Sequence, residues 1–307
     1  MKIVYTPDDL DGSLPHPVAA VGNFDGVHLG HQRILETLRQ RAAPHDGTVV
    51  VITFNPHPQR VLHPDTAPRL IATRGQKVAW LEAAGVDLML ELPFTRQLAA
   101  LSPLDFVERV LQRGLRVAEV HIGRNFRFGH DRTGSFETLE ELGRAHGFTA
   151  MPVDGVRQGG RRISSSRIRT ALGEGEVQLA AALLGRQEVL VGQVVPGDAR
   201  GRILGFPTAN LAVENELVPF TGVYATSMVV DREPLPAVTN IGSRPTFPGA
   251  GPALETHILD YDGDLYGRDV ELRFVERLRD ERRFAGLDEL KEQIALDVAA
   301  ARKVLGS

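Results

Sequence analysis

The hydrophobic positions of the first 184 residues form short runs with few polar interruptions. Val18–Val21 is short and apolar, and Thr48–Phe54 is rich in β-branched residues without alternating polar positions. Runs of this kind predict strands that are buried on both faces. Further runs of apolar character lie at Val86–Leu92, Val117–Ile122 and Phe148–Val153. We therefore expect five strands in this part of the chain.

Between these runs the apolar residues follow a helical period. We expect the first helix to begin near Gly30, with one apolar face made of Ile34, Leu35, Leu38 and Ala42. The other predicted helices span about Gln76–Ala84, Ser102–Arg113 and Ser135–His146. Ser102 is the expected N-cap of its helix, because a proline follows it at the first helical position. Alternating strands and helices predict an α/β fold with a mostly parallel sheet between two helical layers.

After Leu184 the pattern changes to strand-like runs separated by Gly, Pro and Asp. These runs are Glu188–Val195, Gly222–Val230, Ala237–Ile241, Leu254–Leu259 and Val270–Leu278. No helical period lies between them, so we expect an antiparallel barrel or a sandwich. An amphipathic helix closes the chain, with Asp288 as its expected cap and a stripe of Leu290, Ile294, Val298, Ala301 and Leu305. The fold class is thus α/β plus β, with predicted domains at 1–184 and 185–307.

The composition and net charge of the chain argue against several classes of protein function. The chain of 307 residues has 35 basic and 39 acidic residues and a net charge of -4, which favours neither nucleic acid nor a membrane surface as partner. It contains no cysteine, which excludes disulfides, thiolate metal sites and cysteine nucleophiles. No signal-peptide core and no apolar run of about 18 residues is present. We expect a cytoplasmic protein, and the sequence carries no signal for an oligomeric state.

Polar residues with candidate chemistry follow three of the predicted strands. The first group, which we call the anchor loop, spans residues 20–31 and contains Gly22, Asn23, Phe24, Asp25, Gly26, His28 and His31. The second group is Gly123–Gly129 and the third is Arg161–Arg169. Ligands of parallel sheets bind beyond the carboxyl ends of the strands. We therefore expect all three loops to lie at that edge.

A strand, a glycine-bearing loop and a helix N-terminus together make an anion site, because free backbone N–H groups and the helix dipole point to one place. The imidazoles of His28 and His31 could hold phosphate oxygens there. The third loop adds hydroxyl groups and guanidinium groups, which suit phosphate as well. Taken singly, each signal has a plainer alternative: a serine-capped helix with a solvated basic face, or histidines that only cap or pack. Metal binding by the two histidines is disfavoured, because no zinc-helix motif accompanies them.

The second domain contains the segment Gly201–Leu211, in which Thr208 and Asn210 are two residues apart. In an extended chain these side chains share a face and could converge on one ligand or ion. The alternative is a polar turn that leads into a strand. Gly222–Ala225, Asn240–Phe247 and Glu255–His257 follow further along the chain. No P-loop motif occurs in the chain.

The anchor loop, the Asn-Phe-Arg-Phe-Gly loop, the Ile-Ser-Ser-Ser segment and the Pro-Thr-Ala-Asn segment together resemble the bacterial bifunctional riboflavin kinase/FMN adenylyltransferases. The resemblance covers nearly the whole chain. It implies a Rossmann-like nucleotidyltransferase domain at 1–184 and a riboflavin kinase barrel at 185–307. It also implies two reactions: riboflavin and ATP give FMN and ADP, and FMN and ATP give FAD and pyrophosphate.

In the first domain the resemblance implies that His28 and His31 bind ATP phosphates and stabilise the transition state, with Mg²⁺ on the departing pyrophosphate. The anchor-loop residues Gly22, Asn23, Phe24, Asp25 and Gly26 complete this implied site. Contacts to the β- and γ-phosphates are implied for Ser164, Ser165, Ser166 and Arg169. A loop on the flavin side is implied for Asn125, Phe126, Arg127 and Phe128. Asn55 occupies a position where the family often has an acidic residue.

In the second domain the resemblance implies that Thr208 and Asn210 bind Mg²⁺ and ATP phosphates, with Gly201 in the same loop. Glu255 is implied as the general base that takes the proton of the ribityl 5′-hydroxyl, a role that suits a positioned carboxylate. Arg279 and Phe284 are implied on the flavin side. Pro196 replaces a histidine that the family often has before Gly197.

Three other functions fit the sequence less well. A kinase with a decayed adenylylation site conflicts with the presence of His28, His31, Asn125 and Ser164. A nucleic-acid-binding module on residues 157–169 conflicts with the mild net charge and with the lack of aromatic residues in that basic segment. A flavin storage protein has no need of two phosphate-binding constellations.

Overall fold

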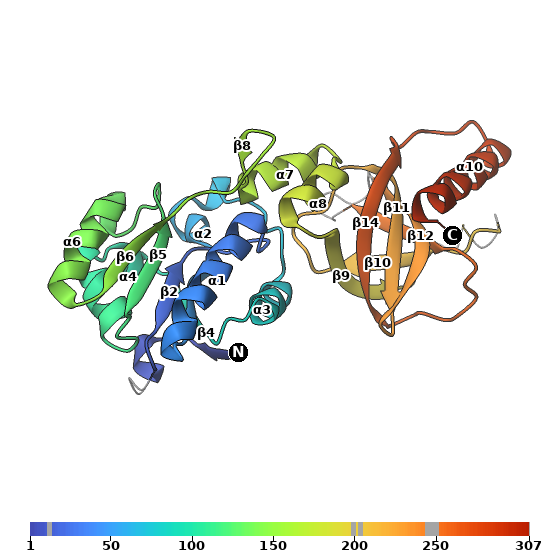
Figure 1. The fold of residues 1–307 in the computed structure, drawn as a ribbon. Coiled ribbons are helices and arrows are strands. Elements are labelled where there is room, and N and C mark those ends of the chain that lie inside the picture. Colours follow the sequence, from blue (N-terminus) through green and yellow to red (C-terminus); the bar gives the residue numbers. More distant parts are fainter. Residues whose placement is uncertain (11–13, 198–200, 202–204, 243–251, 307) are drawn as a thin grey trace. The chain divides into compact units, whose positions relative to one another are not determined.

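The computed structural model describes residues 1–10, 14–197, 201, 205–242 and 252–306 (Figure 1). Internal contacts divide the chain into two compact units. The first unit comprises Met1–Arg69 and Arg74–Ile163, and the second comprises Leu70–Thr73 and Ser164–Ser307. The proposed domain division at residue 184 stays a prediction.

The first unit is built on a six-stranded sheet in which every strand pair is parallel. In spatial order its strands are β1 (Lys2–Val4), β4 (Leu88–Pro93), β3 (Val49–Asn55), β2 (Val18–Val21), β5 (Glu119–Gly123) and β6 (Thr149–Val153). The predicted parallel sheet is therefore confirmed. Strand β1 was not predicted, because three residues are too few to show a period.

Helices cover both faces of this sheet, as expected. On one face α1 (Leu29–Ala42) and α3 (Arg74–Ala83) pack their apolar residues on Val49, Val51 and Met89. On the other face lie α5 (Pro103–Phe106), its π-helical continuation η4 (Val107–Gln112) and α6 (Phe136–His146). Short elements complete the unit: η1 (Pro7–Asp9), η2 (Ala43–His45), α2 (Pro58–Leu62), η3 (Pro64–Thr66), α4 (Arg96–Ala99), η5 (His130–Arg132), β7 (Arg157–Gln158) and β8 (Arg161–Arg162).

Ser102 caps α5 as predicted, because its Oγ accepts a hydrogen bond from the Asp105 N–H at 3.0 Å.

The strand order places a topological switch point between β2 and β5. From β2 the chain continues to β3 and β4 on one side, and it returns to β5 and β6 on the other side. Ala20 of β2 pairs with His121 of β5 in parallel register. The loops that follow these two strands therefore leave adjacent strands at the same edge. This is the position at which open α/β sheets bind their ligands.

The second unit contains a closed antiparallel barrel, so the barrel is confirmed over the sandwich. Around the barrel its strands are β10 (Ala209–Val213), β13 (Ala253–Ile258), β12 (Glu233–Gly242), β11 (Gly222–Val230), β14 (Asp269–Arg279) and β9 (Glu188–Val195). Strand β10 was missed, because it is short and contains the polar Asn210. Helices α7 (Ser165–Gly173) and α8 (Val177–Leu184) precede the barrel in the same unit.

Helix α10 (Leu287–Leu305) packs against β11 and β12, where Val298 and Ala301 meet Val223 and Val238 (Figure 1). The prediction of Asp288 as its cap is wrong, because the N-cap position belongs to Gly286. Asp288 instead lies in the first turn, where a carboxylate stabilises the positive end of the helix dipole.

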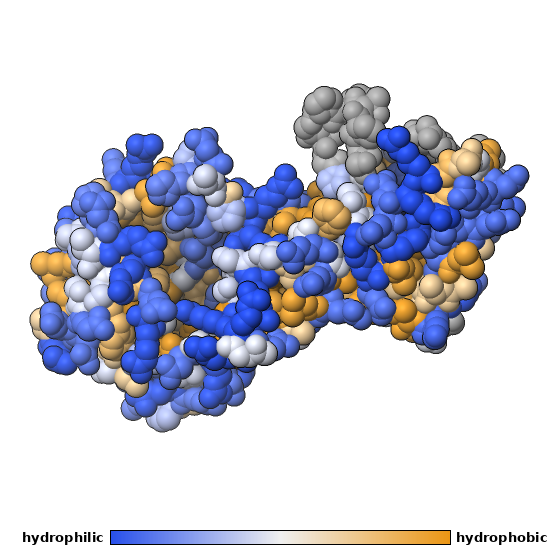
Figure 2. Space-filling model, turned by 90° about the horizontal axis from the view of Figure 1, so that it is seen from above, coloured by the Kyte–Doolittle hydropathy of each residue, from blue (hydrophilic) through white to orange (hydrophobic). Residues whose placement is uncertain are grey.

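No helix within the described ranges is both long enough and apolar enough to cross a bilayer. The face shown in Figure 2 is mostly hydrophilic, and hydrophobic residues lie scattered among the hydrophilic ones.

Candidate active sites

The anchor loop joins the end of β2 to the start of α1. His28 is the N-cap of α1, and its Nδ1 accepts a hydrogen bond from the His31 N–H at 3.3 Å. The two imidazoles stack with ring centroids 3.7 Å apart and planes inclined by 12°. A Cβ atom at Gly30 would lie 3.0 Å from Cε1 of His28, so the tight approach of the ring favours glycine at this position. The sequence therefore places both histidines in one stacked pair at a helix N-terminus.

The His31 imidazole is poised to receive a ligand. Burial, followed by the neighbouring His28 ring and Arg162, holds its pKa well below the usual range, so the ring is neutral at pH 7. Its Nδ1 is buried, and no described residue gives this atom a hydrogen-bond partner. Buried polar atoms are almost always paired, so an orphan nitrogen at a predicted anion site indicates a missing ligand. A neutral imidazole can donate one hydrogen bond to a phosphate oxygen.

The anchor loop holds an unusual backbone conformation. Phe24 has φ of 50° and Val27 has φ of 38°, in the left-handed region that a β-branched residue rarely adopts. The strain is held by neighbouring side chains: Gln32 Nε2 donates to Val27 O at 2.9 Å, and Thr53 Oγ1 donates to Asn23 O at 3.2 Å. Such strain persists only where the surroundings fix it, and it concentrates at functional sites.

Loops after β3 and β5 flank the anchor loop. The carboxamide of Asn23 lies 3.0 Å from Nε2 of His57, which caps α2 by accepting the Gln59 N–H at 3.2 Å. Asn55, the position of the predicted departure, ends β3. The sequence predicts the segment Phe54–Pro58 to be part of a substrate loop and predicts no catalytic role for His57, although its place after a buried strand is a signal for this edge of the sheet.

The predicted flavin-side loop has two kinds of residue. Asn125 and Arg127 are exposed, whereas Phe128 is buried and stacks with Phe126 at 6.1 Å between centroids. Phe128 pairs with Gly134 in an isolated antiparallel bridge. Contact of this loop with a flavin stays a prediction.

The serine segment begins α7 in the second unit. Ser164 is the N-cap, and its Oγ accepts a hydrogen bond from the Arg167 N–H at 3.3 Å. Ser165 and Ser166 form the first turn, and Arg169 is half-buried on the next. Phosphate binding by these four residues, and the expected convergence of this segment with the two other loops, stay predictions.

The barrel brings the second set of predicted residues together. Asn210 of β10 lies directly opposite Glu255 of β13, which in turn lies opposite Asn240 of β12. Residues that face each other across neighbouring strands have Cβ atoms about 5 Å apart on one face of the sheet. His257, two residues after Glu255, lies 2.8 Å from the Pro207 carbonyl oxygen through its Nδ1 and thereby holds the Pro-Thr-Ala-Asn turn. Arg202–Leu204 and Ser243–Phe247 of the predicted motifs lie outside the described residues.

Two glycines make room for the side chains of the Pro-Thr-Ala-Asn turn. A Cβ atom at Gly197 would overlap the carboxamide of Asn210. A Cβ atom at Gly201 would overlap the Phe206 carbonyl and lie 3.0 Å from Oγ1 of Thr208. A side chain at residue 197 would therefore displace the Asn210 carboxamide, whereas one at residue 201 would meet the backbone. Pro196 precedes the first of these glycines. The donor set of hydroxyl, carboxamide and carboxylate oxygens fits Mg²⁺, which prefers oxygen ligands and takes the rest from phosphates and water.

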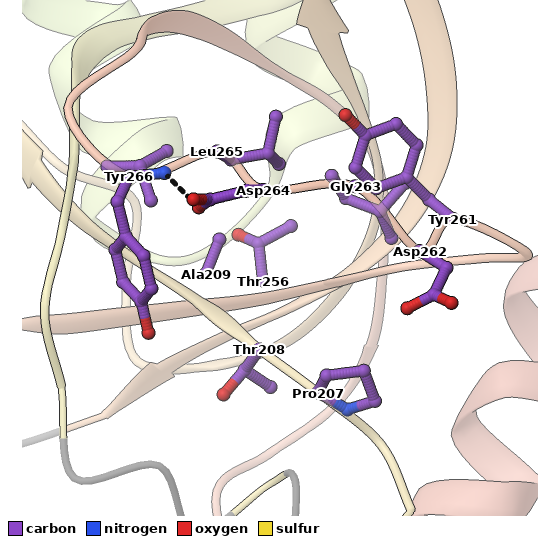
Figure 3. A pocket seen from close by; sticks show the side chains of 12 residues that line it. Pro207, Thr208, Ala209, Thr256, Tyr261, Asp262, Gly263, Asp264, Leu265 and Tyr266 are labelled. Atoms are coloured by element: carbon purple, nitrogen blue, oxygen red, sulfur yellow. Dashed lines mark hydrogen bonds between the residues drawn. The ribbon is translucent and has the colours of Figure 1, made fainter.

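A cavity of about 570 Å³ opens beside Thr208. In Figure 3, Pro207 and Thr208 lie on one side of it and the segment 261–266 on the other. Asp264 fixes this segment by accepting the Tyr266 N–H at 3.0 Å. The cavity is lined by Val194, Pro207, Thr208, Ala209, Thr256, Ile258, Tyr261, Asp262, Gly263, Asp264, Leu265 and Tyr266. In the sequence the segment 261–266 lies between two predicted strand-like runs, and only the fold shows that it lines a cavity.

Arg279 and Phe284, predicted on the flavin side, lie next to each other. The Arg279 guanidinium binds the buried Asp297 of α10 at 2.8 and 2.7 Å, and it lies 5.8 Å from the Phe284 ring centroid. Arg279 therefore fastens α10 to β14. A flavin contact for either residue stays a prediction.

Comparison with protein families divides the chain between two family models. A family model described as FAD synthetase matches residues 12–167, and a second one, described as Riboflavin kinase, matches residues 184–305. The chain is thus a two-domain transferase that makes flavin nucleotides. The described ranges contain no group of three or more His, Asp or Glu side chains that is placed to hold a metal ion.

Whole-chain relatives identify the family. The chain is 45% identical to the bifunctional riboflavin kinase/FMN adenylyltransferase of Pseudomonas fluorescens over 93% of this chain and 92% of the relative. It is 41% identical to the protein of the same description from Escherichia coli (strain K12), over 94% and 93% of the two chains. The chain belongs to the bifunctional riboflavin kinase/FMN adenylyltransferase family. It phosphorylates riboflavin with ATP to FMN and adenylylates FMN with ATP to FAD.

A solved structure has the same fold. A protein from Streptococcus pneumoniae, described as a macrolide-efflux protein, matches with a TM-score of 0.90 and 30% identity over 98% of both chains.

Proposed function

We propose that FMN forms at the Thr208–Asn210–Glu255 site of the barrel and that FAD forms at the anchor loop. The kinase assignment is carried by the register that sets Glu255 opposite Asn210, and by the two glycines that clear space around Asn210 and Thr208. The adenylylation assignment is carried by the stacked His28 and His31 and by the partnerless Nδ1 of His31 among the described residues.

At the kinase site Glu255 acts as the general base. Its carboxylate accepts the proton of the ribityl 5′-hydroxyl while that oxygen attacks the γ-phosphorus of ATP. The new bond joins the ribityl oxygen to phosphorus, and the bond from phosphorus to the β,γ-bridging oxygen breaks to release ADP. Thr208 and Asn210 hold the phosphates in line, and they would hold Mg²⁺, which neutralises the charge of the transferring phosphoryl group. The cavity beside Thr208 takes the nucleoside part of ATP, since aromatic walls with a few polar groups suit a base and its sugar.

At the anchor loop no proton transfer is required, because the FMN phosphate is already ionised. A phosphate oxygen of FMN attacks the α-phosphorus of ATP, and the bond to the pyrophosphate oxygen breaks. His28, His31 and the backbone N–H groups at the start of α1 stabilise the charge that develops on the phosphate oxygens. The predicted roles of Ser164, Ser165, Ser166 and Arg169 are to bind the β- and γ-phosphates.

Two substitutions test the assignment of the sites. His31→Ala is expected to lower FAD formation from FMN and ATP by at least about 100-fold, since a preorganised donor to developing charge is lost. FMN formation in the same preparation is expected to stay at the wild-type rate. Glu255→Ala is expected to do the reverse. Both rates are measured by chromatographic time courses with ATP and Mg²⁺. A wild-type rate for the reaction assigned to the substituted residue contradicts that assignment.

A further inference from the structure

A buried charged cluster lies beneath the anchor loop and has no part in the mechanism described so far. Thr53 of β3 and Glu91 of β4 pair in parallel register, so their side chains share one face of the sheet. Both are buried, with exposures of 0% and 2%. Lys77, in the first half of α3, reaches this pair with its ammonium group 3.5 Å from Oγ1 of Thr53.

Hydrogen bonds connect Lys77 to the backbone of the anchor loop. The ammonium donates to Thr53 Oγ1, and the Thr53 hydroxyl in turn donates to the carbonyl oxygen of Asn23 at 3.2 Å. The hydroxyl thus accepts one hydrogen bond and donates another, which polarises both in the same sense. Asn23 directly precedes Phe24, whose φ of 50° begins the strained part of the loop.

The charges that face Lys77 come from every side of the cluster. Glu91 on β4 and Asp25 in the anchor loop attract the ammonium, whereas Arg74 on the same helix repels it. Burial lowers the pKa of Lys77. Arg74 donates to Glu91 Oε2 at 2.8 Å, whereas Glu91 Oε1 is buried with no hydrogen-bond partner in the described part of the chain. Lys77 is partly buried, and its ammonium has the Thr53 hydroxyl as a hydrogen-bond acceptor. Withdrawing a charge from water costs free energy, which the facing carboxylates and this hydrogen bond offset.

We propose that Lys77 is a positioning residue for adenylyl transfer, which acts through Thr53 to hold the carbonyl of Asn23 and, with it, the strained anchor loop. The inference rests on the proposed adenylylation site. It extends that site to two residues, one on α3 and one on β3, that touch no substrate.

A double-mutant cycle tests this route. Lys77→Met keeps an unbranched side chain that is one heavy atom shorter and removes the charge, and Thr53→Val keeps the shape and removes the hydroxyl. Each is expected to lower kcat for FAD formation by on the order of 10- to 100-fold, because a displaced loop misaligns the reacting groups. The KM for FMN is expected to stay unchanged. The kcat of the double variant for FAD formation is expected to equal that of the less active single variant, because both substitutions interrupt the same chain of hydrogen bonds.

Matched controls separate positioning from folding. Lys2→Met removes an exposed lysine of the same unit and is expected to leave both activities unchanged. Trp80, the one tryptophan of the chain, lies one turn from Lys77, so its fluorescence follows the unfolding of the first unit. If Lys77→Met lowered the urea midpoint while kcat per folded molecule held, Lys77 would be structural only. Multiplicative losses of kcat in the double variant would show two independent paths and overturn the proposal.

The outcome is distinguishable from a failure of the site assignment. If His31→Ala abolishes FAD formation and Lys77→Met does not lower kcat, the assignment of FAD formation to the anchor loop is supported and the proposal for Lys77 is contradicted. If neither substitution affects FAD formation, the adenylylation site itself lies elsewhere.

Discussion

At the scale of single residues, the position of the Asn210 side chain depends on a neighbouring glycine. Its carboxamide occupies the space where a side chain at residue 197 would begin. The carboxamide therefore has its position because Gly197 has no Cβ. The distance between Asn210 and Glu255 across the strands depends on that position, so a substitution at Gly197 acts on the kinase chemistry without removing a polar group.

Gly197→Ala is expected to lower FMN formation by at least about 10-fold, because a small displacement of a phosphate-holding group misaligns the transfer. FAD formation from supplied FMN is expected to stay at the wild-type rate. The measurement is the kcat of each reaction in one preparation. Gly173→Ala serves as the control, since a Cβ atom there meets nothing within 4 Å and alanine favours a helix. Wild-type FMN formation by Gly197→Ala would mean that the turn rearranges at no cost.

At the scale of elements, an ionic network fastens the end of α1 to β5. Arg41 donates two hydrogen bonds to the carboxylate of Glu119, at 2.9 and 2.6 Å, and His121 Nε2 lies 3.0 Å from the same carboxylate. Glu119 and His121 are buried, whereas the Arg41 side chain is 49% exposed. The Arg41 hydrogen bonds lower the pKa of Glu119, and burial lowers the pKa of His121.

Both shifts have the same sign in the pH dependence of stability. Below about pH 6.5 a histidine binds a proton in the unfolded chain. The folded His121, with its lower pKa, stays neutral, so the free energy of unfolding falls as the pH falls. The contribution of Glu119 is present above its unfolded pKa and is lost as the pH falls through its lower folded pKa. His121→Gln is therefore expected to make the decline between about pH 6.5 and 5 shallower. Urea unfolding followed by Trp80 fluorescence checks this, and an unchanged slope would contradict it.

Loss of the Arg41 guanidinium is expected to lower the free energy of unfolding more than loss of the His121 imidazole. Arg41→Met leaves the Glu119 carboxylate buried without its charged donor, which destabilises the first unit by about 1–3 kcal/mol after allowance for the exposure of Arg41. Arg41→Met is expected to lower the urea midpoint at pH 7 and to leave kcat unchanged, because the network lies at the edge of the sheet opposite the anchor loop.

At the scale of the whole molecule, the chain catalyses two reactions that share ATP and a flavin. Under the proposed assignment, the product of the barrel reaction is the substrate of the anchor-loop reaction. All residues proposed for phosphoryl transfer lie in the second unit. The stacked histidines lie in the first unit, and the serine segment proposed for the same adenylylation site lies in the second. Because no residue is proposed for both sites, a substitution at one site is expected to remove one reaction and to keep the other.

A mixture of the two single-site variants tests this separation. His31→Ala and Glu255→Ala, combined with riboflavin, ATP and Mg²⁺, are expected to form FAD after a lag, because FMN released by the first variant reaches the second through solution. The lag is expected to shorten as the total protein concentration rises. The measurement is a chromatographic time course, with each variant alone as the control. FMN that accumulates without FAD in the mixture would show that FMN passes only within one molecule.

Particular residues show how far the sequence predicted this protein. The strands β2 and β3 and the helices α1 and α6 were predicted within two residues, because their apolar runs and helical period are long enough to set a local conformation. The choice of Asp288 as a cap failed, because a capping residue has no period and the first turn also favours acids. His28, His31, Thr208 and Asn210 could be predicted as site residues because each pair lies within four residues along the chain.

By itself the sequence determined the parallel sheet, the antiparallel strands and the residue types of both sites, because period and local motif act over a few residues. The tertiary structure alone decided which distant residues meet. Register set Glu255 opposite Asn210, and packing brought Lys77 of α3 to Thr53 of β3 beneath the anchor loop. A local pattern states which face of a strand is buried, but the neighbour across that face is chosen by the pairing and packing of the whole chain.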